Sequence, residues 1–134
     1  MKIGFDIGGV LSKYPSEFKK LINIFTSNCE LYVITDMHNK EEILKTLLNN
    51  GFGNFKSENV YCADYNKYGN MAKAVLIKEI NIDVFIDDFE PYLVWDSTFG
   101  PQPILLKVMP DNYKPYWHKD WECDGNDFGR RFFI

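Results

Sequence analysis

The feature that most constrains the fold is an alternation along the chain of short apolar runs and longer stretches with helical periodicity. The apolar runs are residues 3–5, 31–34, 60–62, 84–86 and 104–108. Because these runs are nearly continuous in apolar residues, they predict strands that are buried on both faces. Strands that alternate with helices imply right-handed crossover connections and a mostly parallel sheet. We therefore expect an α/β fold, a three-layer α/β/α Rossmann-like domain with a five-stranded sheet.

Three segments between these runs carry apolar residues at the spacing of one helix face. The first follows Pro15, the second follows Asn39, and the third opens at Asn70. Ser16 and Asn39 are the expected N-caps, and Gly51 suits a left-handed C-terminal cap on the second helix. The residues expected to face the sheet are Phe18, Leu21, Ile22 and Phe25 in the first helix, Ile43, Leu44, Leu47 and Leu48 in the second, and Met71, Ala74, Val75 and Ile80 in the third.

Length and composition fit one small domain in a reducing compartment. The chain has 134 residues, 46% of them hydrophobic, which allows a single core without disulfide bonds. Its cysteines are widely spaced and form no C-x-x-C pair, which argues against a disulfide framework and a zinc site. Without a signal-peptide pattern or a membrane-length apolar run, we expect a cytoplasmic protein with no membrane partner. A net charge of −4 makes a nucleic-acid partner unexpected.

Acidic residues follow two of the expected strands. Asp6 comes directly after the first apolar run, and Asp87 and Asp88 come directly after the fourth. In open parallel sheets, ligands bind outside the carboxyl ends of the strands. Adjacent carboxylates repel each other, and burial raises their pKa unless a positive charge lies between them. A hard cation with oxygen ligands removes this conflict. The pattern therefore predicts a divalent-cation site formed by Asp6, Asp87 and Asp88.

Three segments resemble motifs of one enzyme family. The run FDIGGVL at residues 5–11 resembles the first motif of the haloacid dehalogenase-like (HAD-like) phosphohydrolases. Ile34 and Thr35 resemble the second motif, in which a hydroxyl residue ends the second strand, and VFIDD at residues 84–88 resembles the fourth. The order and separation of these motifs fit from Met1 to about residue 108. The resemblance implies a Mg²⁺-dependent phosphatase of the HAD-like fold.

The resemblance also implies roles for individual residues. Asp6 would be the nucleophile that forms an aspartyl-phosphate. Mg²⁺ would be held by the carboxylates of Asp6 and Asp88 and the carbonyl of Gly8, with Asp87 as a neighbouring or water-bridged ligand. Thr35 would donate a hydrogen bond to the phosphoryl group. The residues expected to bind the substrate are Gly8, Gly9, Thr35 and Asp36.

The third motif of this family is a lysine that neutralises the carboxylates and holds the phosphate as a point charge. Lys73 and Lys67 both qualify. The spacing of Lys73 to Asp87 resembles that of compact family members, which favours Lys73. Lys67 remains an alternative because it lies in the preceding loop, from which it could reach the site.

One position departs from the family pattern. Gly8 stands where the family usually has a second aspartate, which protonates the leaving group and then activates water. A positioned acid contributes about 10² to 10⁴ in rate. Asp36 and His38 are candidate substitutes, although Asp36 also fits a turn residue and His38 a surface residue. The alternative is therefore a catalytically impaired protein that binds metal and phosphate or another protein.

The family's usual cap domain has no place in this chain. Only loops fit between residues 10 and 16 and between residues 65 and 70, so the site should be open, which is typical of proteins that act on large substrates. We expect residues 1–134 to form a single domain, with residues 110–134 as an aromatic tail packed on it. That tail could cover the last edge of the sheet, or it could present an aromatic surface or lid to a substrate or partner.

Two other α/β families fit the sequence less well. A response-regulator receiver has its acidic pair at the first strand and its phosphoacceptor at the third, whereas the pair here ends the fourth strand. A dinucleotide-binding domain needs the spacing G-x-G-x-x-G, which the sequence after Gly8 and Gly9 lacks.

Overall fold

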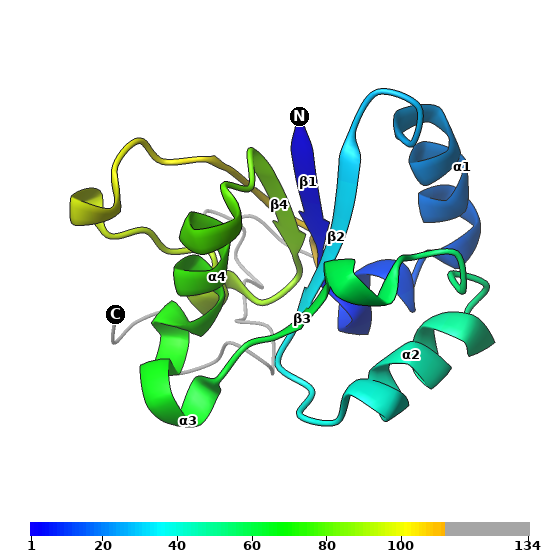
Figure 1. Cartoon of the computed structure of the whole chain (residues 1–134), viewed down its shortest axis with the longest axis horizontal. Coiled ribbons are helices and arrows are strands. Elements are labelled where there is room, and N and C mark those ends of the chain that lie inside the picture. Colours follow the sequence, from blue (N-terminus) through cyan, green and yellow to red (C-terminus); the bar gives the residue numbers. More distant parts are fainter. Residues whose placement is uncertain (112–134) are drawn as a thin grey trace, which may run out of the picture.

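The computed structural model describes residues 1–111, and a parallel sheet forms the centre of this part of the chain (Figure 1). Its strands are β1 (Lys2–Phe5), β2 (Glu30–Thr35), β3 (Val60–Cys62), β4 (Val84–Asp87) and β5 (Ile104–Lys107). They lie in the order β3-β2-β1-β4-β5, and every neighbouring pair is parallel. The expectation of a parallel α/β sheet is thereby confirmed, and each strand bound lies within one residue of the bound expected from the sequence.

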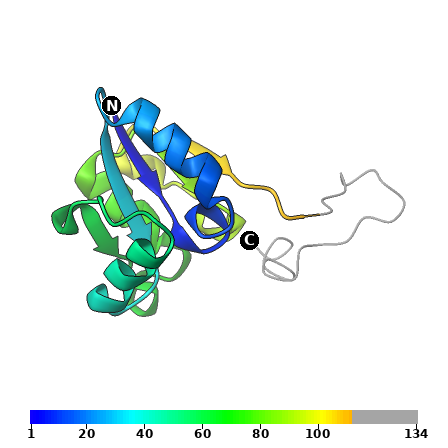
Figure 2. The same ribbon diagram turned by 90° about the vertical axis from the view of Figure 1, so that its right-hand side faces the viewer.

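Helices pack on both faces of the sheet. On one face, Phe18 of α1 (Pro15–Phe25) and Ile43 of α2 (Lys40–Asn49) join a core cluster with Phe5 of β1. On the other face, Ile77 of α4 (Ala72–Ile80) packs in a second cluster with Phe85 of β4. The short helix α3 (Tyr65–Tyr68) precedes α4. Figure 2 shows α1 lying along its face of the sheet. The described residues therefore form three layers, helix, sheet and helix.

Local signals correctly located the two ends of α2. The side chain of Asn39 accepts a backbone N–H from the first turn at 3.1 Å, as an N-cap does. Gly51 has a φ of +85°, in the left-handed region. The N–H groups of Gly51 and Phe52 donate to the carbonyls of Leu48 and Leu47 at 3.0 and 2.7 Å. These two bonds satisfy the last carbonyls of the helix, as in a Schellman motif.

Three expectations about α1 and α2 are wrong. The N-cap position of α1 is Tyr14 rather than Ser16, because Pro15 occupies the first helical position, where its fixed φ and missing N–H are tolerated. Leu21 and Leu48 were expected to face the sheet, but they are 39% and 65% exposed. Only some of the apolar residues of each helix contact the sheet, and the others are exposed to solvent.

Helix α4 begins later than expected. The chain first reverses at Gly69, whose φ is +58°, and makes a tight turn over Gly69–Met71. Asn70 therefore lies in that turn instead of opening the helix. Met71 and Val75 are only partly buried. The residues on the buried side of α4 are Ala72, Lys73, Ala74, Ile77 and Ile80.

The last strand differs from the expectation that every strand is buried on both faces. Ile104 and Leu106 of β5 are 57% and 46% exposed. β5 is an edge strand of the described sheet, and these two residues belong to neither core cluster. Of the expected aromatic tail, only residues 110 and 111 are described, so the expected packing of residues 112–134 lies outside that range. Among residues 1–111, no helix has the length and hydrophobicity needed to cross a membrane.

The strand order determines where a ligand can bind. β1 is central, with β2 and β3 on one side of it and β4 and β5 on the other. The chain therefore continues from β1 toward β2 on one side of the sheet, and from β4 toward β5 on the other side. In open α/β sheets, this change of direction produces a crevice outside the carboxyl ends of the strands. Asp6, Asp87 and Asp88 lie at that boundary.

Candidate functional site

Three carboxylates meet where β1 and β4 end. Asp6 follows β1, and its backbone N–H donates to the carbonyl of Ile86 on β4 at 3.0 Å. Asp87 is the last residue of β4, and Asp88 follows it. One carboxylate oxygen from each aspartate lies within 4.8 Å of the others. Asp87 is fully buried, Asp6 is 7% exposed and Asp88 is about half-buried. The three residues predicted as metal ligands are therefore adjacent.

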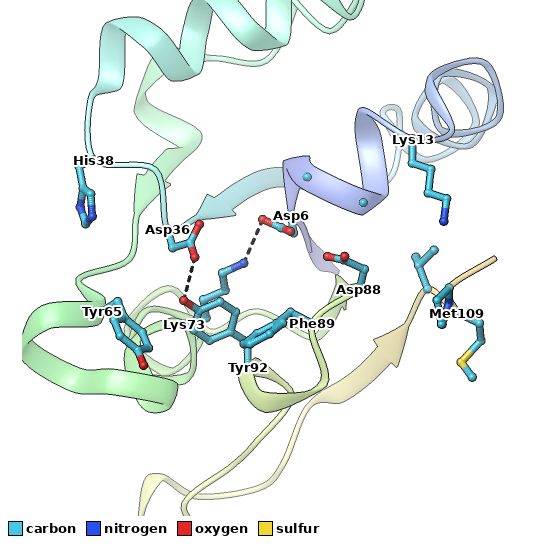
Figure 3. Close-up of a pocket in the computed structure, with 14 residues that line it drawn as sticks. Asp6, Lys13, Asp36, His38, Tyr65, Lys73, Asp88, Phe89, Tyr92 and Met109 are labelled. Carbon is cyan, nitrogen blue, oxygen red and sulfur yellow. Dashed lines mark hydrogen bonds and ion pairs between the residues drawn. The ribbon is translucent and has the colours of Figure 1, made fainter. Parts of the chain in front are cut away.

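A buried lysine lies between two of these carboxylates. Lys73 is in the first turn of α4 and is 1% exposed. Its Nζ is 2.9 Å from Oδ1 of Asp6 and 2.7 Å from Oδ2 of Asp87 (Figure 3 marks the contact with Asp6). Burial alone would lower the pKa of Lys73, but the charges of Asp87 and Asp6 together outweigh it and raise this pKa. Lys73 therefore remains a cation.

The other lysine considered from the sequence lies elsewhere. Lys67 is on α3, it is exposed, and its Nζ lies 5.1 Å from the ring centroid of Tyr68. It does not line the cleft described below. The structure thus brings Lys73, and not Lys67, to the carboxylates.

Asp87 has hydrogen-bond partners on both of its oxygens. Oδ1 accepts the backbone N–H of Phe89 at 3.0 Å, and Oδ2 accepts from Lys73 at 2.7 Å. Asp87 is also absent from the lining of the cleft, whereas Asp6 and Asp88 line it. The geometry therefore leaves Asp6 and Asp88 as the accessible ligands, while Asp87 orients Lys73 and the turn after β4.

The cluster carries more negative than positive charge. Burial raises the pKa of Asp6 to about 8, against the opposing effect of Lys73 and with a further contribution from the charge of Asp87. Burial and the neighbouring Asp87 raise the pKa of Asp88 to about 6. The cluster thus has one ammonium group, that of Lys73, for three carboxyl groups. A divalent cation with a preference for oxygen ligands would relieve this imbalance.

The two glycines after Asp6 differ in what their positions require. Gly9 has a φ of +72°, and a Cβ there would clash with the carboxylate of Asp88, so the close approach of this loop requires glycine. Gly8 has an ordinary φ of −65° and ψ of 130°, and a Cβ there would meet nothing within 4 Å. Neither backbone conformation nor space therefore requires glycine at position 8.

A cleft of about 710 Å³ opens over Asp6 and Asp88 (Figure 3). The residues that line it are Asp6, Gly8, Gly9, Lys13, Asp36, His38, Tyr65, Lys73, Asp88, Phe89, Tyr92, Val108, Met109 and Pro110. Of the residues predicted to bind the substrate, Gly8, Gly9 and Asp36 belong to this lining. Thr35 does not; it is 2% exposed, and its Oγ1 accepts the N–H of Met37 at 3.3 Å.

A hydrogen bond across the cleft links the ends of β2 and β4. The hydroxyl of Tyr92 donates to Oδ2 of Asp36 at 2.8 Å, and the ring centroid of Tyr92 lies 4.5 Å from Nζ of Lys73. Burial, together with this hydrogen bond, raises the pKa of Tyr92. Asp36, considered above as a turn residue or a substitute acid, is thus the acceptor for Tyr92. His38 is exposed at the cleft.

The sequence interpretation named none of seven lining residues as a site residue: Lys13, Tyr65, Phe89, Tyr92, Val108, Met109 and Pro110. Phe89 and Tyr92 come shortly after the acidic pair Asp87 and Asp88, and this position was the one feature of the sequence that could have indicated them. Lys13 lines the cleft as well, and its Nζ lies 3.3 Å from Oδ1 of Asp111. Nothing in the sequence indicated Tyr65, because it is the tertiary fold that brings its ring to Tyr92, in the segment after β4.

No family model, no curated protein and no solved structure matches this chain. The arrangement itself combines an accessible carboxylate on Asp6, a fixed ammonium on Lys73 and an acidic partner on Asp88. Such a site can bind a divalent cation together with an anion, and it can present a carboxylate oxygen to an electrophile.

Proposed function

We propose that this protein is a Mg²⁺-dependent phosphatase that hydrolyses phosphoric monoesters through an aspartyl-phosphate on Asp6. The observation that carries the proposal is the contact of Lys73 with Asp6 and Asp87, next to Asp88, in an accessible cleft. A carboxylate, a lysine and a second carboxylate that can hold a metal are the components that phosphoryl transfer needs. The resemblance of residues 5–11 and 84–88 to HAD-like motifs agrees with this function.

In this reaction a carboxylate oxygen of Asp6 attacks phosphorus and forms an oxygen–phosphorus bond. The bond from phosphorus to the alcohol oxygen breaks, and that oxygen takes a proton from solvent as the alcohol leaves. Water then hydrolyses the aspartyl-phosphate and releases inorganic phosphate. Lys73 holds the phosphoryl group through its ammonium charge and keeps Asp6 oriented. Mg²⁺ bound by Asp6, Asp88 and the Gly8 carbonyl would neutralise charge on the phosphoryl oxygens.

The decisive experiment measures hydrolysis of 4-nitrophenyl phosphate by the full chain, with Mg²⁺ and with a chelator. We expect turnover that needs Mg²⁺ and that falls by at least about 10³-fold in Asp6→Asn, because the nucleophile is lost. Glu58→Gln is the control, since Glu58 is an exposed carboxylate outside the cleft. Full activity of Asp6→Asn would contradict the proposal.

One observation favours a second function. The space around Gly8 would accept a side chain, yet the residue present supplies no acid for the leaving group. A protein that binds Mg²⁺ and phosphate without hydrolysing esters would account for this. It predicts that inorganic phosphate binds in an Mg²⁺-dependent way that Asp88→Asn weakens, while no ester in a broad panel is hydrolysed.

A further inference from the structure

One wall of the cleft is built from three aromatic rings. Tyr65 comes from α3, and Phe89 and Tyr92 come from the segment after β4. The centroid of Tyr92 lies 6.3 Å from that of Tyr65, at an interplanar angle of 80°, and 5.0 Å from that of Phe89, at 61°. These are edge-to-face contacts, which hold the rings in fixed relative orientations. The wall is therefore a preformed aromatic surface beside Lys73.

The rings of this wall are not equally accessible. Tyr92 is 5% exposed, and its ring and hydroxyl are engaged with Lys73 and Asp36. Tyr65 is 42% exposed and is packed against the ring of Tyr92. Tyr65 therefore offers ring surface to a ligand, while Tyr92 supports it from behind.

The two ends of the cleft differ in what they contain. In Figure 3, Lys13 and Met109 lie on one side of Asp6, and Tyr65 and His38 lie on the other. On the first side, Val108, Met109 and Pro110 run along the cleft, and Asp111 pairs with Lys13 at 3.3 Å. Among residues 1–111, Tyr65 is the most exposed of the three aromatic residues that line the cleft. A substrate that extends from its phosphate toward this end of the cleft therefore meets an aromatic surface.

We propose that the cleft takes phosphate monoesters whose alcohol carries a planar aromatic ring, and that this ring stacks on Tyr65. The inference rests on the proposed phosphatase function and names its substrate class. A planar ring is stabilised on an exposed aromatic side chain by stacking, which does not depend on the identity of the ring. A nucleoside monophosphate and a phosphotyrosine share this chemistry, and the experiment separates them.

The experiment compares kcat/KM for Mg²⁺-dependent phosphate release within two pairs of substrates, using the full chain. Adenosine 5′-monophosphate is paired with ribose 5-phosphate, and O-phosphotyrosine with O-phosphoserine; within each pair the second member lacks the ring. In at least one pair we expect the member with the ring to be preferred by about tenfold or more, in line with one stacking contact. The pair that shows the preference identifies the source of the ring.

Variants at Tyr65 test whether this residue causes the preference. Tyr65→Leu should bring the ratio of the two kcat/KM values close to one, and Tyr65→Phe should retain it, because stacking needs the ring and not the hydroxyl. Tyr68→Leu is the matched control, since Tyr68 lies on the same short helix, is 40% exposed and does not line the cleft.

The outcomes separate this inference from the function on which it rests. Mg²⁺-dependent turnover with no preference for a ring, or with a preference that Tyr65→Leu leaves intact, overturns the inference and leaves the phosphatase in place. Absence of turnover for all four esters and for 4-nitrophenyl phosphate overturns the phosphatase proposal, and the inference with it.

Discussion

At the scale of single residues, Lys73 has the largest electrostatic role in the site. It is a buried cation in contact with two buried carboxylates, Asp6 and Asp87. Transfer of these charges from water is unfavourable, and the close contacts offset that cost only while every partner is present. Removal of the lysine would leave two buried negative charges near each other and near Asp88.

We therefore expect Lys73→Met to lower the free energy of unfolding at pH 8 by about 3–5 kcal/mol. At pH 5 the loss should be smaller, because Asp6 without its cation binds a proton and becomes neutral. Urea unfolding at the two pH values measures both quantities. Lys78→Met, an exposed lysine on the same helix, should change stability by only about 0.5 kcal/mol. Equal losses at both pH values would contradict this account of the cluster.

Gly8 and Gly9 provide a second test at this scale. An aspartate fits at position 8, where φ is −65° and a Cβ has open space. If leaving-group protonation limits the reaction, Gly8→Asp should raise kcat for alkyl phosphates by about 10²-fold. It should change 4-nitrophenyl phosphate hydrolysis much less, because that leaving group needs no proton.

The matched variant Gly9→Asp should lose activity and stability, because φ is +72° there and the new side chain would clash with Asp88. Thermal unfolding and Mg²⁺-dependent phosphate release measure both variants. A Gly8→Asp protein with unchanged kcat for alkyl phosphates would show that protonation of the leaving group is not what limits this site.

At the scale of elements, the helix ends show which local signals are reliable. Asn39 and Gly51 act through hydrogen bonds and φ values within a few residues, and both were correctly assigned from the sequence. Ser16 was misassigned because a neighbouring local signal, Pro15 at the first helical position, took precedence. Leu21 and Leu48 were misassigned because burial depends on the width of the contact with the sheet.

The cap on α2 gives a prediction at this scale. Asn39→Ala removes the side chain that accepts the N–H of Glu42 at 3.1 Å, and it should lower the free energy of unfolding by about 1 kcal/mol. Urea denaturation measures the change. Asn23→Ala is the control, because Asn23 is an exposed position inside α1, where alanine has the higher helix propensity. A cap variant as stable as wild type would mean that water replaces the lost bond at no cost.

At the scale of the whole molecule, the acidic cluster couples the stability of the fold to pH. The pKa of Asp6 is raised to about 8 and that of Asp88 to about 6, from an unperturbed value of 3.8. In this range of pH the folded chain binds more protons than the unfolded chain at these two groups. Their contribution to stability is therefore largest below about pH 4 and is lost as the pH rises toward 8.

A Mg²⁺ ion at the proposed site would reverse this loss, because it would bind the ionised carboxylates of the folded chain. We expect the increase in Tm caused by Mg²⁺, relative to a chelator, to be small at pH 5 and to grow through pH 6.5 to pH 8. Thermal unfolding at these three pH values tests the prediction, and Asp88→Asn should reduce the effect. An increase in Tm that is the same at all three pH values would contradict a metal site at Asp6 and Asp88.

The sequence by itself determined the type and limits of nearly every strand, the ends of α2 and the occurrence of carboxylates at two strand ends. These features depend on periodicity, caps and turn residues, which act over a few positions. It could not determine that β4 lies beside β1, which brings Asp87 and Asp88 to Asp6. Strand order follows from the packing of both faces of the sheet, and that is a property of the entire chain.

The tertiary structure alone also decided which side chains complete the site. It directs Lys73 inward from the first turn of α4 and leaves Lys67 exposed. It likewise joins Tyr92 to Asp36 and places Tyr65 in the wall of the cleft. The physical reason is that a buried charge or an aromatic contact is stable only when partners from distant segments meet, and no local pattern specifies those partners.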